Sequence, residues 1–159
     1  MTVGTLSGSH PPPHRSSYDD DGACSIYKDT KPAEWPQHLE DLGRQVVDSA
    51  LKVHKQIGPG LLESVYEVCL ARELTKRAVN VRRQVPVPVI YEGERLDAAF
   101  RLDLLVEDEI VVEIKAVEKV IPLHQAQLVT YLRLSEKRIG FLINFNVRLI
   151  RDGIHRIVL

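Results

Sequence analysis

Three polar side chains interrupt two apolar runs between residues 101 and 116, and their types and spacing could hold a divalent cation. The segment reads RLDLLVEDEIVVEIKA, two runs rich in Val, Ile and Leu around an acidic turn, which predicts a β-hairpin. If the turn is centred on Asp108, Asp103 lies opposite Glu113, and Lys115 shares a face with Glu113 because side chains alternate along a strand. Facing carboxylates repel each other, and a bound cation with Lys115 alongside would offset that repulsion. A turn shifted by one residue would put the carboxylates on opposite faces, so the prediction depends on this register.

An alternative interpretation makes these polar residues the solvated face of an ordinary antiparallel hairpin, with Lys115 neutralising its neighbours. Against it stands the composition of the second run, Ile110-Val111-Val112-Glu113-Ile114, which is apolar on both faces. This pattern is typical of a central strand that is covered on both sides. Charges on such a strand are rarely left without partners or function. The sequence therefore favours a site over a solvated face.

The residues suit metal-assisted hydrolysis of a phosphodiester. Mg²⁺ prefers oxygen ligands and keeps open positions for water, and we expect Asp103, Glu113 and the main-chain carbonyl of Ile114 to supply part of its shell. Lys115 would orient the water or stabilise developing negative charge. Glycoside hydrolysis is disfavoured because a lysine between two carboxylates lowers the pKa of the one that must act as the acid. The sequence contains no Ser-His-Asp elbow, Walker loop, HExxH motif or paired CxxC motif, which excludes those classes.

The elements that must position these residues follow from periodicity. Apolar spacing predicts amphipathic helices over residues 39–57 and 61–77, separated by Gly58-Pro59-Gly60, and a third helix over 123–136 after Pro122. Strands are expected over residues 79–91, 96–106, 110–116, 139–145 and 154–159. Two prolines place the first strand at an edge of the sheet, and the last strand is expected at the other edge. The order predicts an α/β domain with a mixed sheet flanked by helices.

Composition divides the chain into two parts. Residues 1–36 are rich in Ser, Pro, Gly and Asp without periodicity, which predicts a disordered tail, and residues 37–159 are long enough for one domain with a core. Cys24 and Cys69 fit neither a disulfide framework nor a metal cluster, which favours a reducing compartment, the cytoplasm. We expect no membrane span and no signal peptide, because no apolar run reaches the necessary length.

The predicted domain is close to neutral. The tail holds three of the 21 basic and five of the 22 acidic residues, which leaves 18 and 17. This balance argues against a tight, sequence-blind DNA clamp, which needs many cations to neutralise phosphates. Lys76, Arg77, Arg82 and Arg83 could form a local basic strip. They could equally be the cationic last turn of a helix followed by a solvated strand edge.

Several of these residues resemble the signature of a known superfamily. Asp103 followed by Glu113-Ile114-Lys115 resembles the PD-(D/E)XK nuclease signature, with Leu102 where the literal pattern has Pro. The segment GLLESVY at 60–66 resembles the motif that names the GxxExxY family of that superfamily. Gln127 and Tyr131 are similar to the QxxxY helix motif of its recombination-exonuclease branch. The resemblance covers residue 39 to the C-terminus, including LINFN at 142–146, and leaves the tail unexplained.

The resemblance implies a restriction-endonuclease-like fold and a nuclease that uses Mg²⁺, or Mn²⁺, to hydrolyse DNA, and it admits a homodimer. It makes Glu63 a further metal ligand or a base that positions water, whereas alone Glu63 reads as a first-turn carboxylate favoured by the helix dipole. Gln127 and Tyr131 would support Lys115 or contact a substrate phosphate, whereas alone they read as a helix surface with a half-buried tyrosine.

Substrate contacts are expected from Tyr66, which packs beside Glu63, and from Arg82 and Arg83. His124 either approaches the site or lies on the surface. The alternative function is a catalytically silent module of the same fold that binds nucleic acid or a partner, and a scaffold that recruits partners through its tail is a third. DNA versus RNA, strandedness and endonuclease versus exonuclease action stay open.

Overall fold

The computed structural model describes residues 35–159, with only the backbone of residues 97–99. These residues form one compact unit, Trp35–Leu159. The elements are α1 (Gln37–Ile57), α2 (Glu63–Lys76), β1 (Val81–Tyr91), β2 (Glu94–Val106), β3 (Ile110–Lys115), α3 (Pro122–Leu134), β4 (Ile139–Asn144), the 3₁₀ helix η2 (Ile150–Gly153) and β5 (Ile154–Val158). The helices and strands occur in the predicted order. The expected disordered tail lies outside the described residues, apart from its last two.

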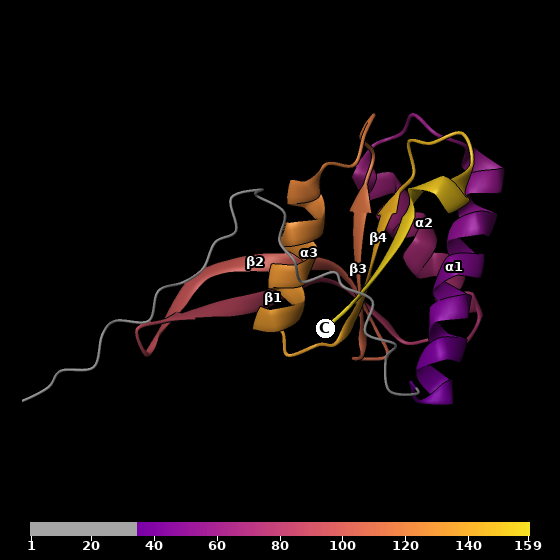
Figure 1. Ribbon diagram of the computed structural model, residues 1–159. Helices are drawn as coiled ribbons and strands as arrows, with labels where there is room; N and C mark the ends of the chain where they lie inside the picture. The colour runs from indigo at the N-terminus through magenta and orange to yellow at the C-terminus, as the bar shows by residue number, and fades with distance from the viewer. Residues whose placement is uncertain (1–34) are drawn as a thin grey trace, which may run out of the picture. The chain divides into compact units, whose positions relative to one another are not determined.

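The five strands form a mixed sheet in the order β1-β2-β3-β4-β5 (Figure 1). Strands β3 and β4 are parallel, and the other neighbouring pairs are antiparallel. Strand β1 occupies one edge, as its two prolines predict, because proline cannot donate to a second neighbouring strand. Strand β5 occupies the other edge, and β3 lies at the centre. The predicted fold class is therefore confirmed.

The hairpin of β2 and β3 has the predicted register. Leu104 pairs with Val112, Leu105 with Val111, and Val106 with Ile110, so the hairpin is centred on Asp108. Glu107 and Asp108 both have positive φ, 49° and 59°, as tight hairpin turns require. Continuing this register by one pair places Asp103 opposite Glu113.

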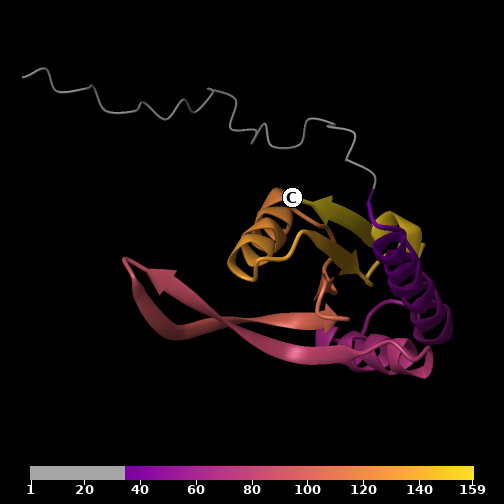
Figure 2. The same cartoon turned by 90° about the horizontal axis from the view of Figure 1, so that it is seen from below.

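Helices cover the two faces of β3, with α1 and α2 on one side and α3 on the other (Figures 1 and 2). Ile110, Val112 and Ile114 pack into the larger core cluster together with α1 and α2. Val111 points the other way and packs with Leu128 of α3 in a second cluster. Because side chains alternate along a strand, Glu113 and Lys115 lie on the α3 side with Val111.

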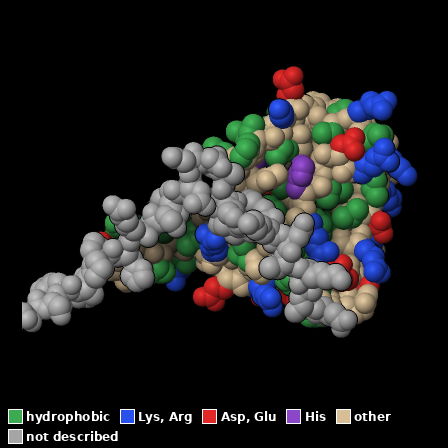
Figure 3. Space-filling view, viewed as in Figure 1, with side chains coloured by type: hydrophobic (Ala, Val, Ile, Leu, Met, Phe, Trp, Pro, Cys, Tyr) green, Lys and Arg blue, Asp and Glu red, His purple; other side chains and the backbone are tan. Residues whose placement is uncertain are grey.

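The outer part of the β1–β2 hairpin extends beyond the helices in both views (Figures 1 and 2). Ile90 and Tyr91 near its turn are exposed. No helix within residues 35–159 is long and apolar enough to cross a membrane. On the face drawn in Figure 3, the Lys and Arg side chains are interspersed with Asp and Glu, in agreement with the near-neutral charge of this part of the chain.

Candidate active site

Glu113 and Lys115 form a buried ion pair on the central strand. The Lys115 Nζ donates to the Glu113 Oε1 over 2.9 Å, and the side chain of Lys115 is only 12% exposed and that of Glu113 only 5%. The other carboxylate oxygen of Glu113, Oε2, is also buried and has no hydrogen-bond partner within residues 35–159, leaving aside side chains 97–99. Solvent therefore does not explain these charges, and the solvated-face interpretation of the hairpin is wrong.

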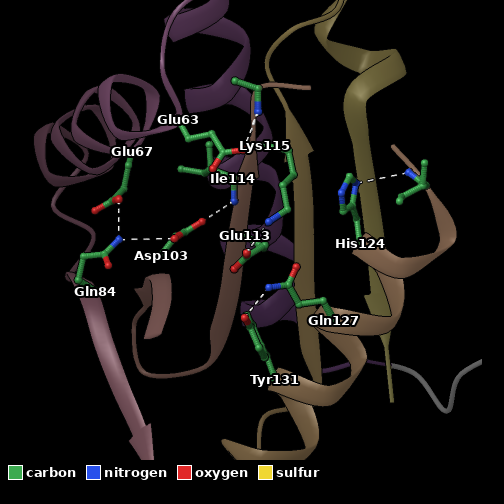
Figure 4. Close-up of polar contacts among 12 residues, drawn as sticks. Glu63, Glu67, Gln84, Asp103, Glu113, Ile114, Lys115, His124, Gln127 and Tyr131 are labelled. Atoms are coloured by element: carbon green, nitrogen blue, oxygen red, sulfur yellow. Dashed lines mark hydrogen bonds and ion pairs between the residues drawn. The ribbon is translucent and has the colours of Figure 1, made fainter. Parts of the chain in front are cut away.

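Asp103 and Glu63 reach the same end of β3 from two other elements (Figure 4). The Ile114 backbone N–H donates to the Asp103 Oδ2 over 2.8 Å. The Ala116 backbone N–H donates to the Glu63 Oε1 over 3.1 Å. Strand β2 contributes Asp103, and the first residue of α2 is Glu63, so α2 and β2 bring these two acids to the C-terminal end of β3.

A fourth carboxylate, Glu67, was missed in the sequence. It is 5% exposed and accepts two hydrogen bonds, from the Arg83 Nε over 2.8 Å and from the Gln84 Nε2 over 2.7 Å. The same Gln84 Nε2 lies 3.5 Å from the Asp103 Oδ1. Glu67 follows Glu63 by one helical turn and so shares its face, a spacing that could have indicated it. We call Glu63, Glu67, Asp103 and Glu113 the acidic cluster.

Tyr66 supports the loop that leads into α2 and is not positioned to meet a substrate. Its ring is fully buried and stacks on Phe145 at a centroid distance of 4.5 Å. Its hydroxyl donates to the Gly58 carbonyl over 2.8 Å and accepts from the Leu61 N–H over 3.0 Å. The predicted substrate contact of Tyr66 is therefore corrected: the residue packs in the core, and it fixes the loop before Glu63.

Gln127 and Tyr131 lie on α3, on the side of β3 that carries Glu113 (Figure 4). The Gln127 Nε2 donates to the Tyr131 hydroxyl. The Tyr131 ring stacks on Phe100 of β2 at a centroid distance of 4.2 Å. The structure thus confirms the helical pair and its half-buried tyrosine, and the hydrogen bond of Gln127 is to Tyr131 instead of Lys115.

The remaining candidates take part in structural contacts. Arg82 pairs with Asp108 in the β2–β3 turn, and Arg83 pairs with Glu67. Lys76 and Arg77 both lie near Glu73, at 3.7 and 3.8 Å. Each cation of the predicted basic strip thus has a carboxylate partner, which favours the structural interpretation of that strip. The His124 Nδ1 accepts from the Ile121 N–H over 3.4 Å at the start of α3, away from the acidic cluster (Figure 4).

Comparison with known families assigns the described domain to a superfamily. Residues 40–157 match the family model described as the PD-(D/E)XK nuclease superfamily. The chain belongs to this superfamily. A comparison with curated proteins finds no match. The superfamily's fold is that of nucleases, so the class of ligand that it indicates is nucleic acid. The acidic cluster together with Lys115 is the candidate active site.

The acidic cluster carries more negative charge than Lys115 can balance. Burial, reinforced by the charge of Asp103, raises the pKa of Glu113 to about 7. Burial also raises the pKa of Asp103, against the hydrogen bond from Ile114, which lowers it. Burial by itself would lower the pKa of Lys115, but the hydrogen bond and charge of Glu113 outweigh it, and the net shift is upward. The site therefore holds Lys115 as a cation and still favours additional positive charge.

The residues present fit a hard divalent cation, although they do not form a complete set of metal ligands. Among residues 35–159, leaving aside side chains 97–99, no three Asp, Glu, His or Cys side chains are close enough together to form a metal cluster. The Oε2 of Glu113 is nevertheless buried without a partner among the described residues, and because leaving a buried polar atom unpaired is costly, a cation at this atom would be favourable. The donors around it are carboxylate oxygens, the type that Mg²⁺ and Mn²⁺ prefer.

Proposed function

We propose that this PD-(D/E)XK protein is a metal-dependent nuclease that hydrolyses phosphodiester bonds of DNA. The observation that carries the proposal is the buried Glu113 carboxylate, whose one oxygen accepts from Lys115 and whose other oxygen has no partner in the described part of the chain. A buried carboxylate oxygen without a donor destabilises the fold, because the free-energy cost of removing it from water is not compensated. It is a good ligand for a cation.

The acidic cluster would hold Mg²⁺ or Mn²⁺ through Asp103, Glu113 and the main-chain carbonyl of Ile114, with Glu63 as a further ligand or as the base that positions water. A bound divalent cation makes its water more acidic and neutralises charge on phosphate oxygens. Lys115 has a raised pKa and stays protonated at neutral pH, so its role is to donate hydrogen bonds and stabilise negative charge on the phosphate, not to accept a proton.

The pair on α3 would act on the substrate side of the site. Stacking on Phe100 limits rotation of the Tyr131 ring, and the hydroxyl of Tyr131 in turn fixes the amide of Gln127. We propose that this pair contacts a substrate phosphate or supports Lys115 when the nucleic acid is bound. Such contacts position the scissile bond, and misplacement by a single ångström can slow a reaction about a hundredfold.

We further propose that the chain is a member of the GxxExxY family. Each named residue of the motif has a physical reason in the structure. Gly60 has a φ of 98°, which favours glycine, and Glu63 begins α2 and reaches β3. Tyr66 ties the loop together through its hydroxyl. The motif thus describes a rigid turn that delivers a carboxylate to the end of the central strand.

A second candidate function is a silent module of the same fold that binds nucleic acid or a partner without cleaving it. One observation favours it: Glu63, Glu67 and Asp103 already accept hydrogen bonds from the protein, and no metal cluster exists among the described residues. Calorimetric titration with Mn²⁺ separates the two functions. A saturable site that is lost in Asp103→Ala and Glu113→Ala supports the nuclease, and the absence of such a site supports the silent module.

The decisive experiment is a cleavage panel. Single- and double-stranded DNA and RNA, linear and circular, are incubated with Mg²⁺, Mn²⁺ or chelator. The wild type is compared with Lys115→Ala and with Lys55→Ala, a matched control on an exposed position of α1. The proposal expects metal-dependent cleavage of DNA by the wild type and the control, and none by Lys115→Ala. Equal cleavage by all three proteins would show that the activity comes from a contaminant.

A further inference from the structure

Gln84 has a backbone conformation that its place in the sheet does not explain. Among the described residues, six non-glycine residues have positive φ, namely Ala78, Gln84, Glu92, Glu107, Asp108 and Glu136. Five of them lie in turns or connections, and Gln84 alone lies inside a strand, with a φ of 50°. Such a conformation is unfavourable for residues other than glycine and persists only where the surroundings enforce it.

The left-handed backbone changes where the side chains of β1 point. Consecutive residues of a regular strand project to opposite faces. Arg83 and Gln84 nevertheless both donate to the carboxylate of Glu67, over 2.8 and 2.7 Å. The conformation at Gln84 therefore brings two neighbouring side chains to one buried acid on α2.

The same conformation places the Gln84 amide opposite Asp103. The pairs Arg83–Leu104 and Val85–Leu102 flank this position, so Gln84 and Asp103 face each other across β1 and β2. The Gln84 Nε2 lies 3.5 Å from the Asp103 Oδ1, while the Ile114 N–H holds the Asp103 Oδ2 at 2.8 Å. Each oxygen of Asp103 thus faces one nitrogen donor (Figure 4).

Glu67 fixes which end of the amide faces Asp103. Two carboxylates flank the Gln84 side chain, so its NH₂ group is favoured on that side and its carbonyl oxygen would be repelled. Glu67 is buried, and Arg83 balances its charge. The amide is therefore held mainly by the short bond to Glu67, and the longer contact limits how far the Asp103 carboxylate can rotate.

We infer that Gln84 is a positioning residue that sets the orientation of the Asp103 carboxylate toward a bound cation, and that Glu67 holds Gln84 in place. The inference rests on the proposed function in one respect, that Asp103 is a metal ligand. Hydrogen-bond partners of metal ligands commonly change metal affinity by 10- to 100-fold when they are removed. Neither residue needs to touch the cation or the substrate.

Two variants of the full chain test the inference. Gln84→Asn keeps the amide but shortens the side chain, and asparagine tolerates a left-handed backbone better than glutamine does. The double variant Gln84→Glu/Glu67→Gln keeps the number of carboxylates and a hydrogen bond between positions 67 and 84, but it removes the donor that faces Asp103. Gln56→Asn, on an exposed position of α1, is the matched control.

Calorimetric titrations with Mn²⁺ and with Mg²⁺ provide the readout without any substrate, and thermal unfolding confirms that each variant folds. We expect both variants to lose at least tenfold in Mn²⁺ affinity. The loss should be larger for Mg²⁺, because Mg²⁺ tolerates departures from ideal octahedral geometry poorly. If Gln84 only tied β1 to α2, its substitution would not change the preference between the two metals. The double variant, which keeps a hydrogen bond between positions 67 and 84, would then bind metal as the wild type does.

The outcomes separate the inference from the proposed function. Suppose that the wild type binds metal and that both variants fold. If Gln84→Asn and the double variant then bind both metals as tightly as Gln56→Asn does, the inference is wrong and the proposed function stands. If the wild type itself binds neither metal and cleaves no substrate, both are wrong. Reduced affinity in both variants with an enlarged preference for Mn²⁺ supports the inference.

Discussion

Lys115 donates to one oxygen of Glu113, and the other oxygen has no partner among the described residues. The Nζ to Oε1 distance is 2.9 Å, and Oε2 is buried. Lys115 therefore compensates one oxygen of a buried carboxylate on the central strand, and the part of the chain that the structure describes does not compensate the other.

The stability of the metal-free protein should fall as pH rises between about pH 5 and pH 8. The pKa of Glu113 is raised from 4.5 to about 7 in the folded state, so in this window the folded protein binds more protons than the unfolded chain. Stability that is present below the unfolded pKa is then lost as pH rises through the folded pKa. The loss should amount to at most about 3 kcal/mol.

Urea unfolding at pH 5 and pH 8 with chelator present measures this loss. Glu113→Gln, which stays neutral, should flatten the dependence on pH. An unchanged slope in Glu113→Gln would show that Glu113 is not the group that titrates.

Divalent metal should stabilise the protein more at pH 8 than at pH 6. A proton and a cation compete for the same Glu113 carboxylate, so metal binds better once the proton has left. A ligand at a hundred times its Kd stabilises the folded state by about 2.7 kcal/mol. Thermal unfolding with Mn²⁺ or with chelator at the two pH values checks this, and Glu113→Gln should show no metal-dependent shift at either pH.

Asp103→Asn and Lys115→Ala should have opposite effects on stability, although both should abolish cleavage. Asp103→Asn removes a charge that disfavours the ionised Glu113. Lys115→Ala takes away the only hydrogen-bond donor of the Glu113 carboxylate in the described structure and should cost about 1–3 kcal/mol at pH 8. Denaturant unfolding of both variants at pH 8 measures the difference. If both variants lost the same stability, the charges would not interact as the structure indicates.

Tyr66→Phe should destabilise the protein by about 1–3 kcal/mol, because the Gly58 carbonyl and the Leu61 N–H would lose their shared partner. Cleavage should also weaken, since the loop that carries Glu63 becomes less rigid. Tyr91→Phe is the control, because Tyr91 is exposed near the turn of the β1–β2 hairpin. Equal stability of the two variants in urea would contradict the supporting role of the Tyr66 hydroxyl.

The parts of the site that could be predicted from sequence are those set by local rules. Alternation along a strand and one turn residue, Asp108, were enough to predict the register of the β2–β3 hairpin, in which Leu104 pairs with Val112 and Val106 with Ile110. The helix spacing of Gln127 and Tyr131 was likewise sufficient to pair them. Both relations join residues that are close together in the sequence, so local rules are sufficient to predict them.

The parts that were missed depend on contacts between distant segments. Glu67 and Gln84 are 17 positions apart, and only the folded chain shows that they meet. Substrate contacts were predicted for Arg82 and Arg83, and the sequence does not show that they pair with Asp108 and Glu67, which lie on other elements. A left-handed glutamine within a strand also has no signature in sequence, since glutamine is not a residue that favours this conformation.

The place of Gln84 on β1 explains how the fold tolerates it. Strand β1 has a neighbour on one side only, so an irregular residue there disturbs a single ladder of backbone hydrogen bonds, whereas the same residue on β3 would disturb two. Edge strands therefore tolerate an irregular backbone conformation better than central strands do. In this chain the central strand β3 carries Glu113 and Lys115, and the irregular residue Gln84, which we infer orients Asp103, lies on the edge strand β1.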